Sequence, residues 1–305
     1  MERYRTILAV LFAAAIAAGC TRSSTTTAQS SATPQATESA PESTASATTS
    51  AATTNPQATP AANAGTPVNY TDIAGTPDEK YITELAALGV FGTPNGSFNP
   101  NGTITRGDFV KWLVLANNAI FASTPGKQIQ PSQSSTSSYP DVAGSHPDFA
   151  YIQGMYDAGF AVGFPDKTFK PDALLTHEQM IAIKESVDRG GLQQYYVTNW
   201  DSTMPDWKDK GQINKLFRGP VAEDSGLDRV AVTNWNHPNL VIDNVPRTFG
   251  AIAMFRPAQT VTRAQAAAVI WKIGPHNDHV SNPTQDDVPR SAADALAPPT
   301  PTPTP

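Results

Sequence analysis

Three short motifs in this sequence place a threonine directly before a basic side chain. They read Ile104-Thr105-Arg106-Gly107-Asp108, Leu175-Thr176-His177-Glu178-Gln179 and Val261-Thr262-Arg263-Ala264-Gln265. A threonine in this context predicts a helix N-cap, and an amide or acidic side chain three residues later predicts a capping box. Helix N-termini attract anions, and an arginine there adds a planar donor suited to a carboxylate. We therefore expect binding of an acidic ligand, led by Arg106 and Arg263.

Each motif closes a longer pattern that occurs three times. A Phe-x-Pro triplet begins seven residues before each threonine, and a tripeptide ending in aspartate opens each copy. The triplets are Phe98-Asn99-Pro100, Phe169-Lys170-Pro171 and Phe255-Arg256-Pro257, and the openings are Tyr70-Thr71-Asp72, Tyr139-Pro140-Asp141 and Met204-Pro205-Asp206. Apolar residues at three-to-four spacing and punctuating glycines predict a helix, a loop and a second helix in each copy. Because one such stripe cannot form a core alone, we expect the three second helices to converge on a pseudo-threefold axis.

The third copy is longer than the others. Asp206 and Phe255 lie 49 positions apart, against 26 for the corresponding pair in the first copy and 28 in the second. The extra segment contains polar and aromatic side chains that could stack on a saccharide, namely Trp235, Asn236, His237, Asp243 and Asn244. A plain surface loop is the alternative, since long loops grow at low entropic cost.

As a set, these residues resemble the S-layer homology family, whose repeats carry an aromatic-x-Asp opening, a glycine-rich loop ending in Phe-x-Pro and an Ile-Thr-Arg-Ala-Glu motif. The resemblance covers residues 68–274. It implies a mainly α fold, a pseudo-threefold bundle of helix-loop-helix repeats that binds secondary cell-wall polymer, often through a pyruvylated sugar, or a peptidoglycan-linked glycan. It also implies ligand contacts from the opening aspartate and the motif side chain, which carry over to Asp72, Arg106, Asp141, His177, Asp206 and Arg263.

Two points of this assignment have alternatives. Arg and Asp side chains could instead pair across repeats as internal structural bridges. Trp112 and Trp271 could be carbohydrate platforms, although their place in the second helices favours packing. In the second copy His177 stands where the motif has arginine, and only protonation near pH 6 would restore a positive charge there.

The N-terminus has the layout of an export signal. Arg3 and Arg5 precede an apolar run, Ile7 to Gly19, that is too short to span a membrane and that ends directly before Cys20. This junction resembles the lipobox of bacterial lipoproteins, so we predict a signal peptide at 1–19 and an acylated Cys20. Ordinary signal cleavage with an incidental cysteine is the alternative.

Composition sets the remaining boundaries. Residues 21–67 contain no Val, Ile, Leu, Met or aromatic side chain, so nothing in this segment can form a core. Residues 20–67 are therefore predicted to be a disordered linker that begins at the acylated cysteine. We expect repeats at 68–124, 139–190 and 191–274, a linker at 125–138 and a disordered Pro-rich tail at 275–305, in which His276 and His279 form no metal site. A net charge of -6 argues against a nucleic-acid partner.

The sequence thus predicts an exported, membrane-anchored envelope lipoprotein that binds cell-wall polysaccharide and needs no cofactor. No segment outside the predicted repeats is large enough for a catalytic domain, which disfavours a wall-glycan hydrolase. A protein-protein interaction or scaffold module of the envelope is the other alternative. Partners would be the wall glycan and, through the lipid on Cys20, a membrane.

Overall fold

The computed structural model describes residues 68–92, 95–160, 163–191, 200–227, 242–276 and 287–298. All of them belong to one compact unit, and their regular structure is mainly helical. Within these residues no helix is both long and apolar enough to cross a membrane. The predicted signal peptide, Cys20 and the linker to residue 67 lie outside the described residues.

The first two copies each supply a short and a long helix, as the apolar spacing predicts. In the first copy these are α1 (Glu79–Ala87) and α2 (Arg106–Ile120), and in the second α3 (Phe149–Asp157) and α4 (His177–Asp188). Two-residue strands β1 (Asn69–Tyr70) and β2 (Asn95–Gly96) pair in parallel in the first copy, and a 3-10 turn, η1 (Pro125–Lys127), follows α2. Gly89 and Gly159 end α1 and α3 with φ near +80°, which confirms the predicted helix stops.

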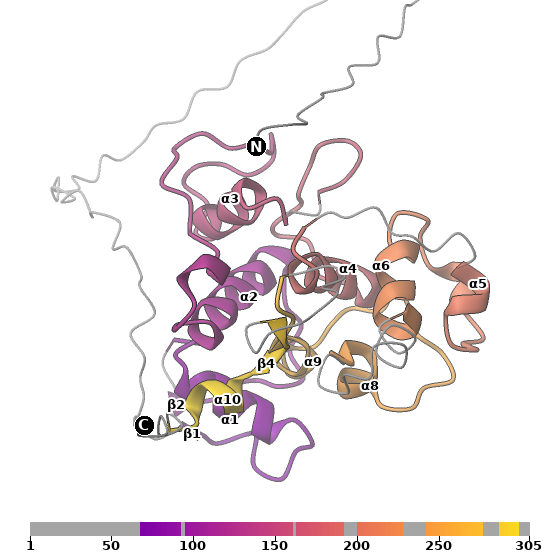
Figure 1. Cartoon of the computed structure of the whole chain (residues 1–305), viewed down its shortest axis with the longest axis horizontal. Coiled ribbons are helices and arrows are strands. Elements are labelled where there is room, and N and C mark those ends of the chain that lie inside the picture. Colours follow the sequence, from indigo (N-terminus) through magenta and orange to yellow (C-terminus); the bar gives the residue numbers. More distant parts are fainter. Residues whose placement is uncertain are drawn as a thin grey trace, which may run out of the picture. The chain divides into compact units, whose positions relative to one another are not determined.

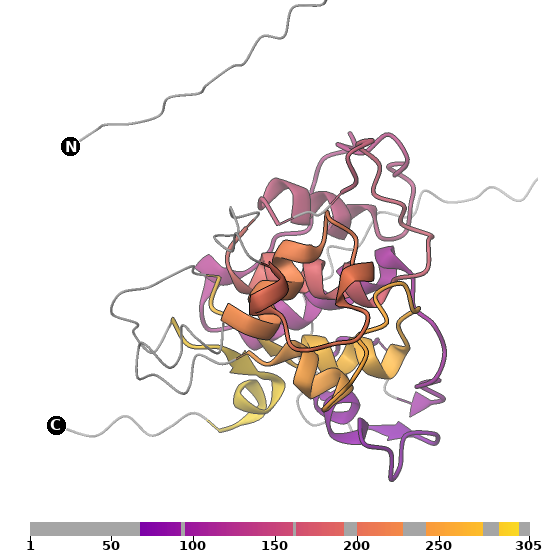
Figure 2. The same cartoon turned by 90° about the vertical axis from the view of Figure 1, so that its right-hand side faces the viewer.

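The third copy has an irregular first half. It contains α5 (Trp200–Thr203), a 3-10 turn η2 (Lys210–Gln212), α6 (Arg218–Ala222), a π-helical turn η3 (Glu223–Leu227) and α8 (Asn244–Phe249), and it closes with α9 (Arg263–Ile270). In Figure 2 the orange helices α6 and α8 lie in front of the magenta helices of the earlier copies. The extra segment is therefore at least partly helical, and its Asn244 is buried instead of exposed. Trp235, Asn236 and His237 lie outside the described residues.

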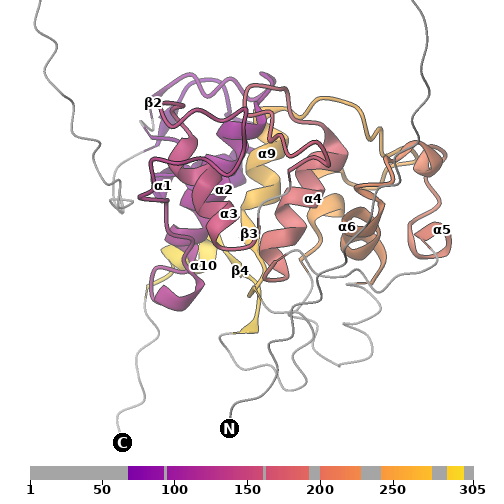
Figure 3. The ribbon, with the colours of Figure 1, turned by 90° about the horizontal axis from the view of Figure 1, so that it is seen from above.

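The second helices of the three copies, α2, α4 and α9, lie side by side, as Figures 1 and 3 show, and each contacts the other two. Just before them, three backbone hydrogen bonds form a closed ring. Ile104 N donates to Val261 O (3.3 Å), Val261 N donates to Leu175 O (2.8 Å), and Leu175 N donates to Ile104 O (3.0 Å). All three side chains are buried, so each copy contributes one apolar residue and one hydrogen bond to the same junction.

Among the three motifs, a complete capping box forms in the third copy, and the first copy forms the threonine cap alone. Thr105 Oγ1 accepts from Asp108 N (3.1 Å), and Thr262 and Gln265 cap each other at the start of α9. The box predicted between Thr176 and Gln179 is wrong, because Thr176 makes no side-chain capping bond. Gln179 Oε1 instead accepts from Arg106 Nη1 (3.3 Å), a contact with another copy that the local pattern does not contain.

The prediction of a disordered C-terminal tail is wrong for residues 275–276 and 287–298. Strand β3 (Lys272–Ile273) pairs antiparallel with β4 (Arg290–Ser291), and α10 (Ala292–Leu296) packs on α1 and α2. Ser291 and Asp294 form a capping box that starts α10. Ala292 is buried and Ala295 packs against the core, so this part of the tail gains apolar burial despite its Pro-rich composition.

His276 also belongs to this ordered part. Its ring lies between Phe121 (5.5 Å between centroids) and Phe160 (5.3 Å), and its Nε2 is 2.7 Å from Asn117 Oδ1. Burial lowers the pKa of His276 to about 4, so the ring is neutral at neutral pH. His276 is therefore a packing residue that joins the end of the third copy to the first two.

Candidate functional site at the junctions between repeats

An aspartate braces the Phe-x-Pro turn in every copy. Asp72 accepts from Phe98 N and Asn99 N, both at 2.8 Å, and also from Ser97 Oγ at 2.6 Å. These bonds lower the pKa of Asp72, with the bond from Ser97 as the largest cause. Asp141 accepts in the same way from the amides of Phe169 (2.9 Å) and Lys170 (2.7 Å). The opening aspartates of the first two copies thus hold the loop with their carboxylates.

In the third copy the brace is Asp209 and not Asp206. Asp209 accepts from Phe255 N (2.8 Å) and Arg256 N (2.7 Å), whereas Asp206 is fully exposed, 3.6 Å from Lys210 Nζ. The tripeptide Trp207-Lys208-Asp209 has the aromatic-x-Asp form, and Trp207 stacks on Phe255 with centroids 4.8 Å apart. The assignment of Asp206 is therefore wrong by three residues, and the aromatic residue was the signal that could have found Asp209.

The brace explains an unusual backbone conformation. The residue before each of the three prolines has a left-handed φ, +57° at Asn99, +58° at Lys170 and +54° at Arg256. A following proline disfavours the right-handed helical region, and the carboxylate accepts the amide of this same residue. Asparagine tolerates this conformation better than lysine or arginine, so the second and third copies hold some backbone strain at the turn.

The motif side chains reach across to the next copy in a cycle. Arg106 Nε donates to Phe169 O (2.9 Å), His177 Nδ1 lies 3.0 Å from Phe255 O, and Arg263 Nε donates to Phe98 O (2.8 Å). Each bond joins the start of one second helix to the Phe-x-Pro turn of the following copy, with the third copy returning to the first. All three predicted motif residues thus occupy equivalent places at the junctions.

The amides at the start of α2, α4 and α9 already donate to main-chain carbonyls. In α2, Arg106 N donates to Ala173 O (3.0 Å) and Gly107 N to Pro171 O (2.9 Å). The corresponding amides of α4 donate to Gln259 O and Pro257 O, and those of α9 to Gly102 O and Pro100 O. An anion would therefore have to displace the neighbouring turn to reach these donors, so the expectation that they are available to a ligand is wrong.

The three junctions differ in access. Arg106 is 1% exposed, and its guanidinium lies 4.7 Å from the ring centroid of Phe164 and 4.8 Å from that of Phe169. Burial lowers the pKa of Arg106 to about 10, so it stays charged. His177 is 3% exposed and packs on Phe249 at 4.4 Å, and burial lowers its pKa. Protonation of His177 near pH 6 is thus opposed by its surroundings.

Arg263 is the accessible member of the set. It is only partly buried and lies over Phe98 (4.8 Å) and Trp112 (4.6 Å). Burial lowers its pKa, while Asp108, Tyr70 and Asp72 act in the opposite direction. Among the described residues its two terminal nitrogens have no hydrogen-bond partner, so they can serve a ligand.

Aromatic rings line this junction. Phe91 lies 4.5 Å from Trp112 and 5.0 Å from Phe98, and Tyr70 lies 5.4 Å from Phe98. Phe98 and Trp112 are buried, which makes Trp112 a packing residue that supports Arg263 from below. Trp271, at the other end of α9, donates its Nε1 hydrogen to Glu84 and lies under Lys80. No motif in the sequence pointed to Phe91 as part of this junction.

The chain resembles known surface proteins over part of its length. The S-layer homology domain family matches residues 69–110 and 138–181, which contain the first and second copies. A cellulosome-anchoring protein of Acetivibrio thermocellus is 31% identical over 132 residues, 43% of this chain and 28% of the relative. Cell surface glycoprotein 1 of the same organism is 27% identical over 126 residues, 40% of this chain and 5% of the relative. The chain thus spans less than a third of either relative.

Proposed function

We propose that this chain, which carries S-layer homology domains at residues 69–110 and 138–181, binds cell-wall polysaccharide non-covalently and is not an enzyme. Residues 191–274 are proposed to be a third, divergent repeat that completes a pseudo-threefold bundle. Two recurring features support this: the closed ring of Ile104, Leu175 and Val261, and the brace of Asp209 on the third Phe-x-Pro turn.

The observation that carries the proposed function is that Arg263 is held in a fixed orientation while its terminal nitrogens remain available to a ligand. Its guanidinium is held in place by Phe98 O and two aromatic faces, yet its terminal nitrogens remain available. A pre-oriented guanidinium suits the carboxylate of an acidic or pyruvylated sugar, because two parallel charge-assisted bonds can form. The exposed parts of the aromatic rings would contact the sugar ring.

The six residues predicted to bind ligand then divide into different roles. Arg263 is proposed to bind the glycan, and Asp72 shapes the same junction by bracing its turn. Arg106 and His177 are proposed to act mainly as bridges between repeats, and Asp141 as the brace of its own turn, because their polar atoms already contact main chain. Asp206 faces solvent away from the brace.

Cosedimentation with purified, protein-free wall material tests this proposal. Arg263→Gln should weaken binding about tenfold or more, since a charge-assisted hydrogen bond contributes ~1.5–3 kcal/mol. Losing the bond to Phe98 O should lower the melting temperature by several degrees but leave the chain folded at the assay temperature. Arg256→Gln removes an exposed guanidinium elsewhere and is the matched control. Equal binding by wild type and Arg263→Gln would contradict the assignment, and no binding of wild type would favour a protein partner.

We further propose that the protein is an envelope lipoprotein, supported by the apolar run before Cys20. The 47 residues from Thr21 to Pro67 would act as a tether with a typical span of about 35–40 Å. Extended, they would reach on the order of 150 Å. Cys20→Ser should release the chain from the membrane fraction, and a lack of fatty-acid label on wild type would refute lipidation.

A further inference from the structure

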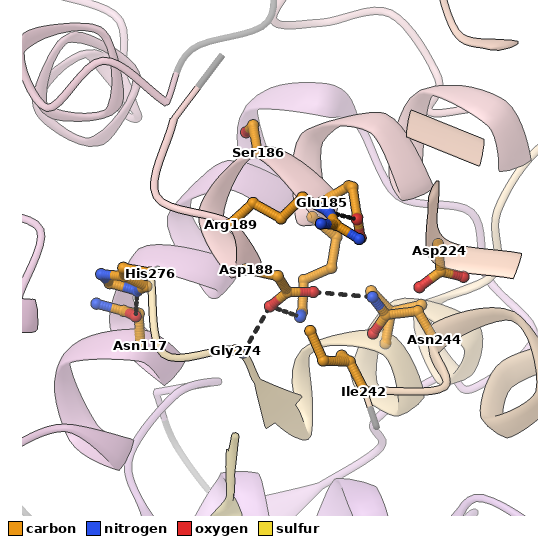
Figure 4. A network of polar contacts seen from close by, with 12 residues as sticks. Asn117, Glu185, Ser186, Asp188, Arg189, Asp224, Ile242, Asn244, Gly274 and His276 are labelled. Atoms are coloured by element: carbon orange, nitrogen blue, oxygen red, sulfur yellow. Dashed lines mark hydrogen bonds and ion pairs between the residues drawn. The ribbon is translucent and has the colours of Figure 1, made fainter. Parts of the chain in front are cut away.

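A buried polar cluster joins the second copy to the extra segment of the third. Lys184 and Asp188 lie one turn apart on α4, and Asn244 is the first residue of α8. All three are at most 1% exposed. Figure 4 shows Asp188 at the centre, with bonds to Gly274 and Asn244. None of these residues takes part in the junctions described above.

One carboxylate holds a lysine and an asparagine together. Asp188 Oδ1 accepts from Lys184 Nζ and from Gly274 N (2.7 Å), and Asp188 Oδ2 accepts from Asn244 Nδ2 (2.9 Å). The other side of the Asn244 amide faces Arg247, whose Nη2 donates to Asn244 Oδ1 at 2.6 Å. Because Asp188 can only accept here and Arg247 can only donate, the orientation of the amide is fixed.

These contacts match the requirements of amide exchange between the two side chains. A nucleophile needs a nearby base, and an amide carbonyl needs a donor that stabilises the negative charge developing on its oxygen. Asp188 is in position to act as the base for Lys184, and Arg247 is in position to stabilise the oxygen of Asn244. Burial lowers the pKa of Lys184, which favours the neutral amine, although Asp188 opposes this shift.

We propose that Lys184 and Asn244 become joined by an intramolecular isopeptide bond, with Asp188 as the base and Arg247 as the oxyanion donor. The Lys184 ammonium gives a proton to Asp188, and its amine attacks Cγ of Asn244. The Cγ–Nδ2 bond breaks as the Nζ–Cγ bond forms, and the departing nitrogen takes up the second proton that Nζ loses and leaves as ammonia. No oxidant or cofactor is required. Asp188 ends protonated, so two buried charges are removed from the interior.

The bond would have a structural consequence. It would close a covalent loop between α4 and α8 and hold the extra segment against the second copy. If the chain bears a mechanical force between a membrane and a wall, as the proposed function requires, the bond would prevent α8 from separating from α4. The chemistry itself does not depend on that function, so the two proposals can fail separately.

Tryptic peptide mapping of the purified wild-type chain tests the proposal directly. The bond predicts a branched species in which a peptide ending at Arg189, uncleaved at Lys184, is joined to the peptide ending at Arg247. Its mass should be about 17 Da below the sum of the two, the mass of one ammonia. Two linear peptides with normal cleavage at Lys184 would overturn the proposal. Ammonia loss confined to the Asn244 peptide would mean ring closure onto the backbone and would also overturn it.

Two variants separate the chemistry from mere proximity. Asp188→Asn keeps the size of the side chain but removes the base, so the branched species should disappear. Asp224→Asn alters another buried carboxyl of the same region, which accepts a hydrogen bond from Val245 N and not from Lys184, so the branched species should persist. A branched peptide in Asp188→Asn would overturn the role given to Asp188. The wild-type measurement stands even if a variant fails to fold.

Discussion

Replacing Asp209 should destabilise the protein far more than replacing Asp206, although the two lie three residues apart. Asp209 is 3% exposed and accepts the amides of Phe255 and Arg256 at 2.8 and 2.7 Å. In Asp209→Ala the amide of the buried Phe255 loses its partner, which costs about 1–3 kcal/mol. The amide of the exposed Arg256 can bind water, so its loss costs less. We therefore expect the free energy of unfolding to fall by about 3 kcal/mol.

Urea denaturation followed by tryptophan fluorescence measures this effect, because Trp207 stacks on Phe255 next to the brace. Asp206→Ala is the matched control and should leave the denaturation midpoint unchanged, since Asp206 is fully exposed. For a folded region of this size, ~3 kcal/mol corresponds to a drop in melting temperature of about 6–12 °C. Equal effects of the two substitutions, or a larger effect of Asp206→Ala, would refute the assignment of the brace.

Three further predictions concern strain, pH and the C-terminus. Arg256→Asn should raise the free energy of unfolding by about 1 kcal/mol, because asparagine tolerates the left-handed φ of +54°, whereas Arg256→Gln should not; denaturant midpoints compare them. Burial raises the pKa of Asp224 to about 6, so the folded state keeps a proton that the unfolded state loses above about pH 4. The contribution of Asp224 to stability should fall by ~2–3 kcal/mol between pH 4 and 6, and the difference between wild type and Asp224→Asn across that window measures it. Deleting residues 287–305 should lower the melting temperature by several degrees, because it removes β4 and α10, while deleting 299–305 should have no effect.

Local signals in the sequence predicted the parts of the fold that depend on neighbouring residues. The glycine stops at Gly89 and Gly159 and the caps at Thr105 and Thr262 are confirmed, since each involves residues within one helical turn. The same applies to the repeated Phe-x-Pro spacing, which marks a turn with one backbone conformation in all three copies. The ligand roles of the motif side chains stay predictions, because the local pattern does not show what faces them.

Contacts between copies could not be derived in this way. The Gln179 side chain accepts a hydrogen bond from Arg106 instead of capping its own helix. Arg106 is buried against two aromatic rings, whereas Arg263 is accessible. The Pro-rich tail was expected to be disordered from its composition, yet β3 and α1 offer it a strand partner and an apolar surface. Composition describes a segment by itself, whereas order here depends on the surface that receives it.

The sequence by itself determined that one unit is repeated and where the Phe-x-Pro turns and the helices that follow them begin, because these features follow from backbone preferences over a few residues. Only the tertiary structure decided which aspartate braces the third turn, which motif side chain remains open, and that Asp188 joins Lys184 to Asn244. Those outcomes depend on contacts between residues that lie from 46 positions apart, as Asp209 and Phe255 do, to 165 positions apart, as Arg263 and Phe98 do. The energy of such contacts is set by the packing of the whole bundle.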